Sequence, residues 1–99
     1  MMKRQLPRPC CVRGHTFLAD RLPPSPTVLD LGAGFGSFSV GMIRQFGARC
    51  CAVEANRQVC LRIPVSEQLR VLNCAVSDVD GPYRAEQIYL QQHRHRRSL

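Results

Sequence analysis

Residues 30–36 read Asp-Leu-Gly-Ala-Gly-Phe-Gly and combine one carboxylate with three glycines at alternate positions. Glycine adopts a positive φ at little cost, and without a Cβ it lets a ligand approach backbone amides closely. The apolar run before Asp30 predicts a buried strand, and the apolar residues after Phe35 recur at helical spacing. The stretch therefore predicts a strand, a glycine turn and a helix, with a small-molecule site at the turn.

A second carboxylate, Glu54, ends the next apolar run and lies 18 residues after Gly36. This separation is close to the offset of about 20 residues at which an acid accepts hydrogen bonds from the hydroxyls of a bound ribose. Two carboxylate oxygens match two vicinal hydroxyls, which favours a nucleoside-type ligand. A solvated glutamate at a strand end is the alternative.

The glycine spacing favours one cofactor over another. A dinucleotide fingerprint would require glycine at position 37, where this chain has Ser37. An acid at position 30 would repel a pyrophosphate, but it could bind the ammonium group of an amino-acid moiety directly or through water. The pattern therefore favours S-adenosylmethionine over NAD.

The elements that must position these residues follow in regular order. We expect strands at 27–32, 49–54 and 70–77, a helix from about 35 to Gly47, and a short helix that Asn56 caps and Pro64 limits. The order β-α-β-α-β with short connections predicts parallel strands in the order 3-2-1. The predicted fold class is α/β, a Rossmann-like partial doubly wound parallel sheet. Residues 1–22 read as loop, with one or two helical turns in 15–22.

Three segments, "VLDLGAGFGSFSV", "CAVEAN" and "VLNCAVSDVDG", resemble the first three blocks of class I S-adenosylmethionine-dependent methyltransferases of the FkbM type. The resemblance divides the chain into a basic proline-containing segment (1–27), a partial cofactor-binding domain (28–83) and a basic tail (84–99). It implies a cofactor-binding set made of Asp30, Gly32, Ala33, Gly34, Gly36, Glu54, Ser77 and Asp78.

In that family, the loop that corresponds to 30–36 lines the methionine end of the cofactor. The resemblance further implies that Glu54 holds the ribose and that Ser77 or Asp78 lies near the adenine. It covers only the first half of a catalytic domain, so we expect a truncated cofactor-binding half that is inactive alone. The methyl acceptor and the catalytic residues are not readable from the sequence.

Two alternatives stay open. In the first, a second chain supplies the missing strands and completes an active enzyme, because a 3-2-1 half-sheet with both helices on one face leaves its other face uncovered.

In the second alternative, the chain is a small basic nucleic-acid-binding protein. The net charge of +7 is concentrated in the ends, since residues 28–83 hold five basic and five acidic side chains. This distribution is more typical of solvated tails than of a phosphate-binding groove.

The six cysteines include two adjacent pairs and no CxxC spacing, so we expect reduced thiols and no structural metal. Pro, Gly or Arg interrupts every apolar run well before the ~20 residues that a membrane span requires. The predicted location is cytoplasmic, with a basic organellar transit segment at the start as the alternative.

Overall fold

The structure is a computed structural model that describes residues 8–78. The predicted tail at 84–99, its boundary at 83 and most of the predicted turn at 78–81 lie outside these residues. In chain order the elements are β1 (Pro9–Val12), β2 (His15–Leu18), a 3₁₀ helix (Ala19–Arg21), β3 (Thr27–Leu31), α1 (Ser37–Phe46), β4 (Arg49–Val53), α2 (Arg57–Cys60) and β5 (Leu69–Leu72).

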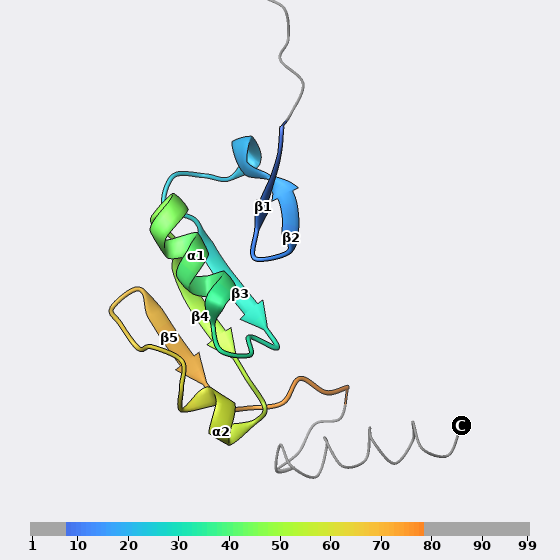
Figure 1. Cartoon of the computed structure of the whole chain (residues 1–99), viewed down its shortest axis with the longest axis vertical. Helices are drawn as coiled ribbons and strands as arrows, with labels where there is room; N and C mark the ends of the chain where they lie inside the picture. Colours follow the sequence, from blue (N-terminus) through green and yellow to red (C-terminus); the bar gives the residue numbers. More distant parts are fainter. Residues whose placement is uncertain (1–7, 79–99) are drawn as a thin grey trace, which may run out of the picture.

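A three-stranded parallel sheet with the order β3-β4-β5 forms the centre of the chain (Figure 1). Leu31 pairs with Val53, and Val53 pairs with Leu72, so the three strands end at the same level. The chain is thus a mixed α/β protein, and its sheet is compatible with part of a Rossmann-like fold. The flush strand ends place the loops that follow them at one edge of the sheet.

Helix α1 has a glycine next to each of its ends. Gly36 precedes the helix with φ 82°, and Gly47 follows it with φ 63° and donates its amide to the carbonyls of Met42 and Ile43. Both φ values lie in the left-handed region that glycine tolerates best. The helix therefore ends at the glycine that the sequence predicts.

The second connection, between β4 and β5, contains much less helix than the first. Asn56 caps α2 as predicted, since its Oδ1 accepts hydrogen bonds from the amides of Gln58 and Val59. The helix has only four residues, and an irregular segment leads from it to β5.

The third strand is shorter than predicted. The prediction of strand over 70–77 is wrong beyond Leu72, where β5 ends. The reason lies in the next residue, because the side chain of Asn73 donates to the carbonyls of Glu54 and Ala55. The Asn73 side chain thus occupies the carbonyls that follow β4, at the point where the backbone hydrogen bonds between β4 and β5 would have to continue.

The prediction of loop and helical turns over residues 1–22 is wrong for residues 9–18, which form the antiparallel hairpin β1–β2. Arg13 and Gly14 connect the strands with φ of 47° and 84°. Two central residues with positive φ match the right-handed twist of a two-residue hairpin. Among residues 8–22, helical structure is limited to the 3₁₀ helix that follows the hairpin.

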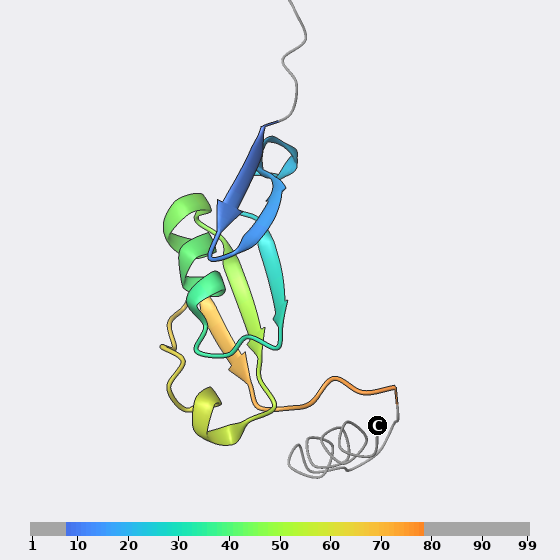
Figure 2. The same cartoon turned by 45° about the vertical axis from the view of Figure 1, so that its right-hand side comes forward.

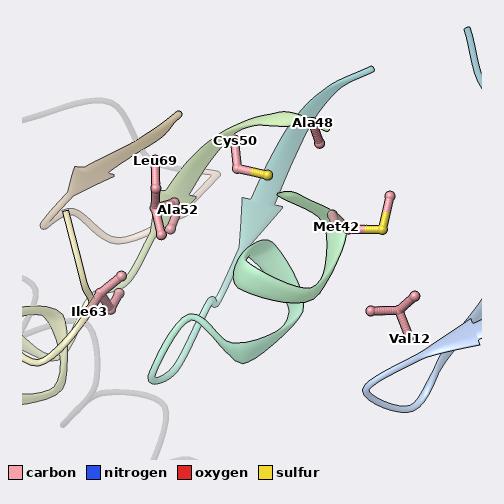
Figure 3. Packing of buried hydrophobic residues seen from close by; sticks show 7 residues of the cluster. All are labelled: Val12, Met42, Ala48, Cys50, Ala52, Ile63 and Leu69. Carbon is pink, nitrogen blue, oxygen red and sulfur yellow. The ribbon is translucent and has the colours of Figure 1, made fainter. Parts of the chain in front are cut away.

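The hairpin packs against α1, and the two join the sheet in one core (Figure 3). Val12 of β1 is 5% exposed, and the rings of Phe17 and Phe46 meet edge to face at 5.7 Å. The buried residues of this cluster come from the hairpin, α1, the connection between α1 and β4, β4, β5 and the segment after α2: Val12, Met42, Ala48, Cys50, Ala52, Ile63 and Leu69.

The opposite face of the sheet is open in the described part of the chain. α1 lies on one face in both views, and no described helix covers the other (Figures 1 and 2). Strand alternation places Leu29, Leu31 and Leu72 on this open face, and their side chains are 63%, 54% and 45% exposed. A parallel sheet is normally covered on both faces, so this apolar surface is unusual for an isolated chain.

Candidate functional site

The candidate site is the edge of the sheet at which β3, β4 and β5 end. Each strand continues into one part of it: the glycine loop 32–36, the Glu54–Asn56 turn, and Asn73. Ligands of open α/β sheets bind beyond the carboxyl ends of the strands. The structure therefore brings the predicted glycine loop and the predicted ribose acid to the edge where such a ligand would lie.

The three glycines of the loop differ in their surroundings, although φ is positive at each. A Cβ built on Gly32 or Gly34 would meet no atom within 4 Å, so both positions face open space. A Cβ on Gly36 would lie 2.8 Å from Cγ2 of Ile63. Gly32 and Gly34 are therefore placed to admit a ligand, whereas Gly36 admits the side chain of Ile63.

Most of the loop amides are bonded within the protein. The amides of Gly32 and Ala33 both donate to the carbonyl of Val53 at 2.9 Å, and the amide of Gly36 donates to the carbonyl of Ala33. The amide of Gly34 donates to the Glu54 carboxylate. A phosphate-binding loop presents its amides to the ligand, and these four amides are directed elsewhere.

Glu54 makes hydrogen bonds through both side-chain oxygens. Its Oε1 accepts from the Gly34 amide at 2.9 Å, and its Oε2 accepts from the Asn56 amide at 2.8 Å. Hydrogen bonds from backbone amides to a carboxylate are charge-assisted and stronger than neutral ones. The carboxylate therefore links the loop after β3 to the turn after β4.

Asp30 lies on the face of β3 that α1 covers. It is 8% exposed, and its Oδ2 accepts a hydrogen bond of 2.7 Å from the hydroxyl of Ser39, which is fully buried. The hydrogen bond between Asp30 and Ser39 joins the end of β3 to the first turn of α1. The carboxylate is therefore held between β3 and α1, and its role toward an ammonium group stays a prediction.

Ser77 and Asp78 lie in the irregular segment after β5, and both are exposed. Their predicted place beside an adenine stays a prediction. Sequence reasoning missed Asn73, whose Nδ2 donates to the carbonyls of Glu54 at 2.9 Å and Ala55 at 3.0 Å. Its only sequence signal is a polar residue inside the run "RVLNCAVS".

Two buried thiols, those of Cys50 and Cys60, are not poised to react. Burial raises the pKa of the Cys50 thiol, and the negative charge of Asp30 raises it further. Burial also raises the pKa of Cys60, with the charge of Glu54 acting in the same direction. A thiol with a raised pKa holds less thiolate at neutral pH, so neither is placed as a nucleophile.

The described residues 8–78 hold no group of three or more His, Cys, Asp or Glu side chains that could bind a metal ion. None of their helices has the length and apolar character needed to cross a membrane.

Comparison with known proteins gives one informative match. No known family matches the sequence, and no curated protein matches it. The structure is similar to a crystal structure of a candidate methyltransferase from an antibiotic biosynthesis pathway of Anabaena variabilis ATCC 29413, with a TM-score of 0.52 and 26% sequence identity. The match covers 62% of this chain and 24% of that one. It supports a methyltransferase-like fold, and this chain spans about a quarter of its neighbour.

Proposed function

We propose that this chain binds S-adenosylmethionine at the carboxyl edge of its sheet, as the cofactor-binding part of an FkbM-type methyltransferase. The observation that carries the proposal is the hydrogen bond between the Glu54 carboxylate and the Gly34 amide. It joins the two features from which the sequence predicts a ribosyl cofactor, in a chain whose structural neighbour is a candidate methyltransferase.

The Glu54 carboxylate retains the capacity to bind a ribose. Its two oxygens offer about four acceptor sites, and the amides of Gly34 and Asn56 occupy one on each oxygen. One site per oxygen remains, which suits the two vicinal hydroxyls of a ribose. On this proposal the cofactor binds without breaking the bonds that fix the loop.

The charge and the donors of the loop favour a sulfonium cofactor over a dinucleotide. A pyrophosphate would find the amides of Gly32, Ala33, Gly34 and Gly36 already bonded. It would also lie near the Asp30 carboxylate, which repels a negative charge. The methionine end of S-adenosylmethionine carries an ammonium and a sulfonium group, so the same carboxylate attracts it. Ser77 and Asp78 would flank the adenine.

The reaction of the complete enzyme would be an in-line displacement. An oxygen or nitrogen of the acceptor attacks the methyl carbon, the bond from that carbon to sulfur breaks, and the electron pair stays on sulfur. Proximity and orientation supply much of the rate in such a step. The described residues provide the cofactor site and no assigned base, so we propose that residues 8–78 bind the cofactor and do not transfer the methyl group alone.

Calorimetry of the 99-residue chain with S-adenosylhomocysteine and S-adenosylmethionine tests the proposal. We expect saturable binding that Glu54→Ala weakens at least tenfold, because the variant removes the ribose acceptor and frees the Gly34 amide. Glu67→Ala is the matched control, since Glu67 is an exposed acid outside the site. NAD should not bind. Folded chain that binds neither adenosyl ligand would refute the proposal.

The open face of the sheet favours a second candidate, an active methyltransferase that another chain completes. Exposed Leu29, Leu31 and Leu72 need a cover, and strands β3 and β5 each pair on one side only in the described part. Methyl transfer from labelled cofactor by a purified complex, and by neither chain alone, is the expected result. A complex that binds the cofactor but transfers no methyl group would count against this candidate.

A further inference from the structure

Asn73, directly after β5, is hydrogen-bonded to the backbone at Glu54 and Ala55. Glu54 lies between the ends of β4 and β5, and its amide donates to the carbonyl of Leu72 at 3.0 Å. The side chain of Asn73 then donates from Nδ2 to the carbonyls of both Glu54 and Ala55. Leu72 and Asn73, at the end of β5, thus bind the amide and the carbonyl of Glu54, respectively.

We infer that Asn73 is a positioning residue for the cofactor site: its two hydrogen bonds to the Glu54–Ala55 backbone fix the Glu54 carboxylate, and through it the Gly34 amide. The inference rests on the proposed function for the part that concerns the ligand. Asn73 is assigned no contact with the cofactor.

The chemistry of the side chain supports this role. Both partners of Asn73 are carbonyl oxygens, so only its amide nitrogen, which carries two hydrogens, can face them. An aspartate has nearly the same shape, but it would place a carboxylate oxygen, which accepts hydrogen bonds, against two carbonyl oxygens that also accept them. Asn73→Asp therefore removes both bonds with little change in side-chain volume.

The hydrogen bonds form a continuous path across the site. Asn73 fixes the backbone of Glu54, the Oε1 of Glu54 fixes the Gly34 amide, and its Oε2 fixes the Asn56 amide. Three strand-end segments that are distant in sequence are thereby joined at one residue, Glu54, through its carboxylate and its backbone carbonyl. Loss of Asn73 should release the Glu54 carboxylate without removing it.

The first test needs no ligand. Hydrogen exchange of the Gly34 amide, followed by NMR on the 99-residue chain, reports whether Glu54 still holds it. We expect Asn73→Asp to speed this exchange about tenfold or more while the amides of β4 keep their protection. Gln45→Glu is the matched control, because it makes the same charge change on an exposed residue of α1. Unchanged Gly34 exchange in a folded Asn73→Asp variant overturns the inference.

The second test separates positioning from general destabilisation by a double-mutant cycle. We expect Asn73→Asp to weaken S-adenosylhomocysteine binding about tenfold in the native chain and to have little further effect in the Glu54→Ala background. Equal losses in both backgrounds would mean that Asn73 does not act through Glu54, and would overturn the inference while the proposed function stands. If the native chain binds no adenosyl ligand, the proposed function and the ligand part of this inference both fail, and Gly34 exchange decides the positioning role.

If Asn73→Asp unfolds the chain, Asn73→Ser provides the same comparison. Serine is small and uncharged, and its single short donor cannot reach both carbonyls. Fast Gly34 exchange in that variant supports the positioning role, and native exchange contradicts it.

Discussion

At the scale of single residues, the loop needs glycine for two reasons: positive φ at all three positions, and close contact with a neighbouring side chain at one of them. The sequence alone does not show which glycine serves which purpose. Gly32 and Gly34 border open space, whereas Gly36 is buried against Ile63. All three have positive φ, so any side chain at these positions costs backbone energy. Only at Gly36 does a second, steric cost add to it.

We therefore predict that Gly36→Ala lowers the free energy of unfolding by about 3 kcal/mol, and Gly34→Ala by about 1 kcal/mol. Ile63 is 4% exposed and β-branched, so it has little freedom to move away from a new Cβ. Urea unfolding of the two variants, each compared with the native chain, measures the difference. Equal losses for the two variants would show that Ile63 yields without cost.

The residues of the site could be predicted to different degrees. The offset between the glycines and Glu54 indicates a shared site, and the structure brings Gly34 and Glu54 within hydrogen-bond distance. Asn73 could not be found in this way, because its partners are backbone carbonyls and its role depends on the register of β5 with β4. A sequence pattern carries no information about a bond that any residue type at positions 54 and 55 would accept.

At the scale of elements, periodicity predicted the parts that local rules control. Strands β3 and β4, helix α1 with its closing Gly47, and the Asn56 cap all follow from apolar spacing and capping chemistry. The hairpin was missed because its turn begins with Arg13, a residue that rarely adopts positive φ. Its strands are stabilised by contact with α1, which the local pattern of residues 9–18 does not reveal.

The contact between the hairpin and α1 depends on Gly41. A Cβ at this position would lie 2.7 Å from Cγ1 of Val12. Alanine favours helix over glycine by about 1 kcal/mol, and the steric conflict opposes that gain. We expect the conflict to win, so that Gly41→Ala lowers the free energy of unfolding by about 1 kcal/mol.

The sign of this effect should depend on Val12. In a Val12→Ala background the conflict is removed, and Gly41→Ala should then stabilise the chain by up to about 1 kcal/mol. Thermal or urea unfolding of the four chains gives both values. Stabilisation by Gly41→Ala in both backgrounds would mean that the hairpin does not pack on α1 in solution.

At the scale of the whole molecule, the sheet has one covered and one open face. Burial alternates along β3, where Val28 and Asp30 lie under α1 while Leu29 and Leu31 are exposed. The sequence predicts this asymmetry because a β-α-β unit with a right-handed crossover places its helix on one face. Which surface covers the other face depends on groups beyond residues 8–78, and no pattern within these strands specifies it.

We predict that the 99-residue chain associates with itself through the open face at micromolar concentrations, since exposed apolar patches of this kind drive association. Sedimentation velocity over a concentration series should show larger species that the double variant Leu29→Gln, Leu31→Gln shifts toward monomer. Leu61→Gln is the control, because Leu61 is 72% exposed but lies after α2, outside the sheet.

Added salt distinguishes association through apolar contacts from association through ion pairs. The net charge of +7 makes copies repel, so salt should screen this repulsion and strengthen an apolar contact, whereas it would weaken association through ion pairs. A chain that stays monomeric at all concentrations and salt levels would contradict the prediction and would indicate that the rest of its own sequence covers the sheet.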